Sequence, residues 1–194
     1  MDREAATVQA LSERGIPLRL ALETYSTAVS QGAVQKSCTS EAFWKQVLQP
    51  MTAKSRLSYA EHRHKHFNEP LTPAEVHLVH SWSMMHCDSL MAAAQFVNDL
   101  NRGPKPDHLK QLLDVHWHEK NSSANLSVPI FMATHSVNQY KVADTKWGSP
   151  ECEIDKFHKI AQEIYKKFNN PVAVAIDEDS TTMTRSLCLQ EIHY

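Results

Sequence analysis

The spacing of apolar residues changes near residue 127, and this change constrains the fold more than any other feature of the sequence. Before it, apolar residues recur every three or four positions, which is typical of helices. After it, apolar and polar residues alternate, which is typical of strands that bury one face. The sequence therefore predicts an α+β protein, with a helical half over residues 1–120 and a strand-rich half over residues 128–194.

The strand-rich half has the predicted order ββαββ. Two strands are expected over residues 128–137 and 140–147, one helix over 150–169, and two strands after residue 171. The helical half should pack against the small antiparallel or mixed sheet that these strands form, with the 150–169 helix covering the sheet. At 194 residues, 42% of them hydrophobic, the chain suits a single domain.

The segment 72–75, TPAE, predicts the start of a long helix. Thr72 fits the N-cap, Pro73 the first helical position and Glu75 the closing side chain of a capping box. Apolar residues then follow at helical spacing to about residue 100. A helix of this length needs partner helices along its apolar seam, and Cys87 on that seam is expected to be a buried core thiol.

Composition and charge exclude several classes of protein. Twenty basic and 22 acidic residues give a net charge of −2, without the basic surplus typical of nucleic-acid binding. No stretch reaches the roughly 18 apolar residues of a membrane span, and the polar start does not resemble a signal peptide. Four cysteines without a CxxC pair favour reduced thiols in a cytosol-like compartment. Four glycines cannot build a nucleotide-binding loop, and no cofactor is expected.

His135 and Asp144 are the first pair of candidate catalytic residues. If Asn138 and Gln139 form a two-residue turn, the strands on either side make a hairpin. His135 and Asp144 then lie on the same face as diagonal neighbours, roughly 7 Å apart. A carboxylate in that position can fix the tautomer of an imidazole and stabilise its protonated form.

Cys38 is the candidate nucleophile, because it lies where a helix is expected to begin. The positive end of a helix dipole lowers the pKa of a thiol. The order cysteine at a helix start, histidine on a strand and aspartate on the next strand resembles papain-like and transglutaminase-like cysteine hydrolases. That resemblance implies a protease or glutamine deamidase acting on a protein amide bond, with Cys38 as nucleophile, His135 as base and Asp144 as orienting acid. Gln35 is the candidate oxyanion donor.

Two alternatives to this enzyme stay open. Cys87 is the alternative nucleophile, with His86 and Asp88 beside it. The chain could instead be a non-enzymatic helical module that presents its long amphipathic helix to a partner protein, with His135 in an ordinary hairpin. The sequence sets neither the substrate nor the oligomeric state.

The twelve histidines raise a further alternative, a zinc-binding protein. His62 and His66 share a helix face at i, i+4, and His77 and His80 repeat the pairing at i, i+3. Zinc requires three or four converging ligands, and neither HExxH nor a CxxC pair is present. No metal site is therefore expected.

Overall fold

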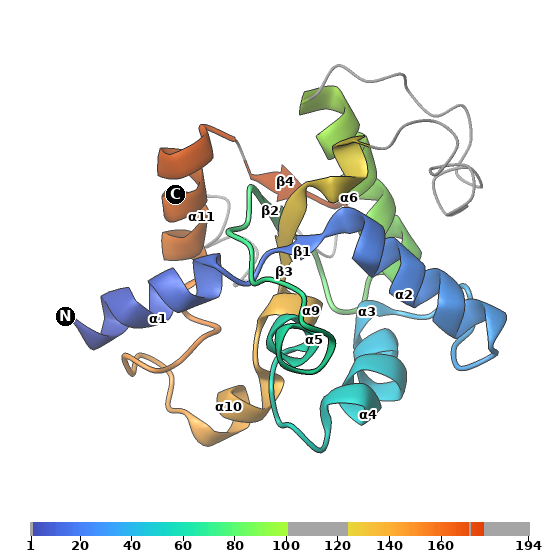
Figure 1. Ribbon diagram of the computed structural model, residues 1–194, viewed down its shortest axis with the longest axis horizontal. Coiled ribbons are helices and arrows are strands. Elements are labelled where there is room, and N and C mark those ends of the chain that lie inside the picture. Colours follow the sequence, from blue (N-terminus) through green and yellow to red (C-terminus); the bar gives the residue numbers. More distant parts are fainter. Residues whose placement is uncertain (1, 101–123, 171, 177–194) are drawn as a thin grey trace.

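A computed structural model describes residues 2–100, 124–170 and 172–176, and Figure 1 shows the arrangement of the elements. The protein is a mixture of helices and a small four-stranded mixed sheet. The strands are β1 (Ile16–Pro17), β2 (Val76–Val79), β3 (Pro129–Met132) and β4 (Ala173–Val174). The larger helices are α1 (Arg3–Ser12), α2 (Leu18–Ser30), α5 (Tyr59–Phe67), α6 (His86–Leu100) and α11 (Phe157–Phe168). The shorter ones are α3 (Ser40–Phe43), the π-helix η1 (Trp44–Leu48), α4 (Gln49–Thr52), the 3-10 helix η2 (Ala124–Ser127), α9 (Ala133–Ser136) and α10 (Gln139–Asp144).

The strands lie in the order β1-β3-β2-β4. β2 is parallel to both of its neighbours, with Leu78 opposite Met132 of β3 and Ala173 of β4. β1 pairs antiparallel with β3 at the edge. Every residue of β2 and β3 is buried. Both faces of these central strands are therefore covered, as is usual for parallel sheets.

Helices cover the sheet on both sides, which makes three layers. Figure 1 shows α1 and α11 on one side of the sheet and α2 and α6 on the other. Side chains alternate between the two cores along β3: Ile130 and Met132 pack in the core toward α2 and α6, and Phe131 packs toward α1 and α11. The α11 side of the core comprises Val8, Leu11, Ala74, Phe131, Val137, Phe157, Ile160 and Ile164. None of the described helices is long and apolar enough to cross a membrane.

The predicted location of the sheet in the C-terminal half was wrong, because β1 and β2 come from the first 120 residues. The predicted helix from Thr72 to about residue 100 is also wrong. Thr72 does not cap a helix; its carbonyl accepts a hydrogen bond from Gly15 N at 2.9 Å, and the chain continues into β2. Because β2 is buried on both faces, its run of apolar residues lacks the alternation that distinguishes a strand from a helix.

The predicted hairpin after β3 is wrong as well. The strand ends at Met132, and the chain then forms α9 and α10. Asn138 does not lie in a hairpin turn, because its side chain caps α10 by accepting hydrogen bonds from the amides of Tyr140 and Lys141 at 3.1 and 3.2 Å. Asn and Asp favour helix caps for this reason. A two-residue turn and a helix cap therefore share the same local signal here.

The predicted C-terminal helix is present, but α11 begins at Phe157 and not at Pro150. The sequence predicts an inner face of Ile154, Phe157, Ala161, Ile164 and Phe168. Phe157, Ala161 and Ile164 are buried, whereas Phe168 is only partly buried and Ile154 lies before the helix begins. The helix expected from the segment DHLKQLLDVHWHEK, residues 107–120, lies outside the described residues, as does the last predicted strand after residue 181.

Gly15 is a position where the fold has no room for a side chain. A Cβ there would lie 2.7 Å from Thr72 O and 2.8 Å from Pro129 Cβ. We expect Gly15→Ala to lower the free energy of unfolding by about 1–3 kcal/mol, because the edge pairing of β1 must shift to admit the methyl group. Urea denaturation measures this. Gln9→Ala, on the exposed side of α1, is the control and should stay within about 0.5 kcal/mol.

Candidate functional site

Cys38 does not have the environment that the sequence suggested. Helix α3 begins at Ser40 with Thr39 as its N-cap, so Cys38 lies one residue before the cap. The thiol is half-buried, and burial raises its pKa. The predicted lowering of the pKa by the helix dipole is therefore wrong. Gln35, the candidate oxyanion donor, accepts a hydrogen bond from Cys38 N through its backbone carbonyl at 3.0 Å, and the residue is exposed.

His135 and Asp144 are not brought together. The side chain of Asp144 is 70% exposed and pairs with Arg56 at 3.4 Å. His135 is 1% exposed, and its Nδ1 shares a hydrogen bond with Thr134 Oγ1 at 2.9 Å. The predicted orientation of His135 by Asp144 is thus wrong, because α9 and α10 replace the hairpin that would have aligned the two side chains.

Cys87, the alternative nucleophile, is buried as predicted, although it lies in the first turn of α6 and not within a longer helix. Its thiol donates to Asp88 Oδ1 at 3.5 Å. Burial, followed by the neighbouring carboxylate of Asp88, raises the pKa of the Cys87 thiol. Burial therefore disfavours the thiolate form of both cysteines.

We expect both thiols to react slowly with iodoacetamide. At pH 7 iodoacetamide should alkylate Cys38 of the native protein more slowly than free cysteine, because burial disfavours the thiolate. Cys87 should react more slowly than Cys38. Mass spectrometry of timed samples gives the rate at each position, with glutathione as the reference thiol. Alkylation of Cys38 faster than glutathione at pH 6 to 7 would contradict this expectation and restore the thiolate nucleophile.

Three buried histidines gather at one edge of the sheet. His80 directly follows β2, His135 lies in the helix that directly follows β3, and His86 begins α6. They are 6%, 1% and 0% exposed. Since the carboxyl ends of parallel strands meet at one edge, the loops after β2 and β3 place these imidazoles together. The rings of His86 and His135 are stacked with centroids 5.6 Å apart.

The hydrogen bonding of His86 and His135 is incomplete. His86 Nδ1 lies 3.1 Å from Ser40 Oγ, and His135 Nδ1 bonds to Thr134. The Nε2 atoms of both rings are buried and have no hydrogen-bond partner among the described residues. An unsatisfied buried polar atom costs about 1–3 kcal/mol, and native proteins contain few of them. Two such atoms in one cluster therefore indicate a functional role for these histidines.

Burial also keeps these rings neutral. It lowers the pKa of His80 to about 4 and that of His135 to about 3, and it lowers the pKa of His86 well below the ordinary value. Neighbouring imidazoles add to the lowering: His80 acts on His135, and both act on His86. At neutral pH the rings can donate or accept hydrogen bonds, but a conjugate acid with a pKa near 3 is poorly matched to proton transfer.

Aromatic side chains contact the cluster, and one of them directly precedes an irregular helix. Phe43 stacks on His86 with centroids 4.1 Å apart and planes 16° apart. Tyr59 contacts His135 edge-on at 5.6 Å. Directly after Phe43 comes the π-helix Trp44–Leu48. Such helices are rare and occur frequently at functional sites.

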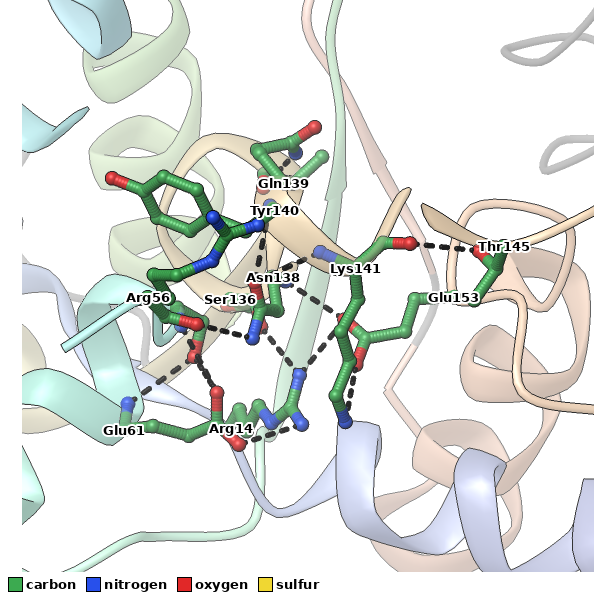
Figure 2. A network of polar contacts seen from close by, with 12 residues as sticks. Arg14, Arg56, Glu61, Ser136, Asn138, Gln139, Tyr140, Lys141, Thr145 and Glu153 are labelled. Carbon is green, nitrogen blue, oxygen red and sulfur yellow. Dashed lines mark hydrogen bonds and ion pairs between the residues drawn. The ribbon is translucent and has the colours of Figure 1, made fainter. Parts of the chain in front are cut away.

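A buried polar network holds the segment that carries His135 (Figure 2). The Arg14 guanidinium pairs with Glu153 at 2.9 Å and Glu61 at 2.8 Å, and it donates to Ser136 O at 3.3 Å. Glu153 also accepts from Asn138 N at 2.7 Å. The network therefore connects the residue after His135 and the cap of α10 to the chain between α1 and β1, to α5 and to the chain before α11.

The sequence pointed to His80 and His86 only as a possible zinc ligand and as a neighbour of Cys87, and it did not predict that they lie together with His135. The available signal was the pair of histidines that flank SWSMM, directly after the apolar run VHLV. Because VHLV was expected to be part of one long helix, the sequence did not indicate that a buried strand ends just before His80. Within the described ranges, no group of three or more histidine, cysteine, aspartate or glutamate residues could hold a metal ion.

Comparisons with known proteins do not assign a family. The chain matches no protein-family model, no curated protein and no solved structure at a significant level.

Proposed function

We propose that the protein is a small-molecule-binding domain whose site lies at the carboxyl edge of β2 and β3. His86 and His135 would hold the ligand through their Nε2 atoms. The observation that carries this proposal is that both atoms are buried without a hydrogen-bond partner among the described residues. Open sheets with parallel strands commonly bind ligands outside the carboxyl ends of those strands.

The surroundings of the two imidazoles favour an uncharged, planar ligand. Burial, followed by the neighbouring imidazole of His80, accounts for the low pKa of His135. An ion would enter this aromatic environment at a high desolvation cost. The ring of His86 stacks on both Phe43 and His135, with interplanar angles of 16° and 20°, and such stacked rings favour a flat ligand. A small heterocycle with ring nitrogens or exocyclic amides, such as a nucleobase, meets both conditions.

Entry of such a ligand requires the Phe43 side chain to move away from His86. Phe43 closes one face of His86, and it is joined directly to the π-helix at Trp44. We infer that a shift of this helix to regular α-helical pairing would displace Phe43 and open the two Nε2 atoms. Binding, and not acid–base catalysis, is the role that neutral imidazoles of such low pKa suit.

Titration with free nucleobases and nucleosides tests the proposal. Adenine, cytosine, uracil and their nucleosides are added to ¹⁵N-labelled protein, and the imidazole nitrogens are followed by NMR together with the midpoint of thermal unfolding. We expect at least one compound to shift the Nε2 signals of His86 and His135 and to raise the midpoint. His86→Phe and His135→Phe should abolish both effects.

His64→Phe, on the exposed side of α5, is the matched control and should bind like the parent chain. Because each Phe variant also loses the Nδ1 hydrogen bond to Ser40 or Thr134, its folding is checked by circular dichroism before titration. If no compound binds at millimolar concentration, or if His86→Phe and His135→Phe bind unchanged, the cluster is not this ligand site.

Neither function expected from the sequence gains support from the described residues. The helical interaction module depended on one helix over residues 72–100, which the structure replaces with β2 and α6. The protease or deamidase hypothesis depends on an activated Cys38, and the alkylation rates test that requirement directly. A cysteine hydrolase remains the competing proposal until those rates are measured.

A further inference from the structure

Two histidines lie one turn apart on α5, away from the buried cluster. The helix begins after Ser58 with a capping box that Glu61 completes. It ends at Asn68, which adopts a left-handed conformation. The rings of His62 and His66 lie on one face with centroids 4.6 Å apart. Residues at i and i+4 of a helix are neighbours, and two histidines at this spacing can bind one metal ion.

The ring of His62 is already held in place. Its Nδ1 shares a hydrogen bond with Ser55 Oγ at 3.1 Å, which leaves Nε2 for a further contact. Metal-binding histidines almost always use their second ring nitrogen in this way, because the bond fixes both the tautomer and the direction of the ring. His66 is exposed, so its ring can rotate to meet an ion that reaches His62.

The two residues next to this pair on the helix, Arg63 and His64, bind to other groups. Arg63 forms an ion pair with Glu69, and its guanidinium lies 4.2 Å above the ring of Phe67. His64, between the pair in sequence, bonds through Nδ1 to Glu69 O at 2.8 Å. Arg63 is thus engaged with Glu69 and Phe67, and His64 with the chain after the helix.

We propose that His62 and His66 together bind one divalent transition-metal ion, with Cu²⁺ preferred over Ni²⁺ and Zn²⁺. No group of three or more potential ligands exists among the described residues, so water completes the coordination of the ion. Imidazole pairs of this kind follow the general order of divalent metal affinity, in which copper binds most tightly. The inference is independent of the proposed ligand site, since it uses none of the buried histidines.

Calorimetric titration of the whole chain with CuCl₂, NiCl₂ and ZnCl₂ tests the site, after treatment with EDTA and dialysis. We expect one equivalent to bind and to raise the midpoint of thermal unfolding by about 5–10 °C at roughly one hundred times the dissociation constant. His62→Ala and His66→Ala should each abolish the rise. Ser55→Ala should weaken binding by about 10-fold, because the ring of His62 would lose its anchor.

His64→Ala is the matched control, since it removes one imidazole from the same helix and should bind the metal like the parent chain. Tight binding that survives His66→Ala would place the ion elsewhere and overturn the proposal. The absence of any binding at 1 mM metal would also overturn the proposal, because roughly millimolar affinity is the weakest that the thermal assay resolves. Folding of the variants is checked by circular dichroism before titration.

Discussion

Arg14→Met should lower the free energy of unfolding by about 3–5 kcal/mol. Arg14 and Glu153 are 5% and 2% exposed at their side chains and form an ion pair at 2.9 Å. Methionine fills a similar volume but leaves the buried Glu153 carboxylate with only the exposed ammonium of Lys141, 3.7 Å away, as a cationic partner. Removing one partner of a buried ion pair is far more costly than the net value of the pair itself, because the remaining charge stays desolvated.

Urea denaturation followed by circular dichroism measures the loss. Arg3→Met is the control, because the pair of Arg3 with Glu151 is exposed and spans 3.6 Å, and its loss should cost no more than about 0.5 kcal/mol. The double variant Arg14→Met, Glu153→Gln should be more stable than the sum of the two single losses predicts, because the most deeply buried carboxylate is removed together with its guanidinium partner. Equal losses for Arg14→Met and Arg3→Met would contradict the buried network.

Some elements of the fold could be predicted from the sequence and others could not. Helices with local signals were predictable: Ser58 and Glu61 form their capping box, and the apolar face of α11 is buried. β2 was not predictable, because a four-residue strand buried on both faces carries no period of its own. Its assignment depends on contacts with β3 and β4, which lie more than 50 residues away in sequence.

The candidate site was predictable in part. His135 was selected from the sequence for its place in an apolar segment, and it does lie at the edge where β3 ends. Its partners are not the carboxylate and thiol that the hairpin suggested, but His86 and Phe43 from separate elements. Such partners follow from the parallel pairing of β2 with β3, which no local pattern in the sequence encodes.

Acidification should destabilise the protein steeply between pH 6.5 and 4. In the unfolded chain His80, His86 and His135 have an ordinary pKa near 6.5. In the folded chain burial lowers the pKa of His80 to about 4 and that of His135 to about 3, and it lowers the pKa of His86 well below its usual range. Above pH 6.5 the three rings are neutral in both states, so they make no pH-dependent contribution.

Below pH 6.5 the unfolded state binds protons that the folded state excludes, so stability falls with pH until the folded pKa values are reached. Each such proton contributes about 1.4 kcal/mol per pH unit, and three give a slope of about 4 kcal/mol per unit near pH 5. The accumulated loss at pH 5 is about 6 kcal/mol, which is comparable to the whole stability of many domains. We therefore expect the chain to unfold between about pH 5 and 4.

Urea denaturation at half-unit steps from pH 7.5 to 5 measures the slope, and variants assign it to individual rings. His135→Phe should reduce the slope by about 1.4 kcal/mol per pH unit, because one proton fewer distinguishes the two states. His64→Phe should leave it unchanged, since that side chain is exposed. A free energy of unfolding that stays constant from pH 7.5 to 5 would mean that the buried imidazoles become protonated within the fold. The unpaired Nε2 atoms would then reach water, and the closed aromatic cover over His86 and His135 would be wrong.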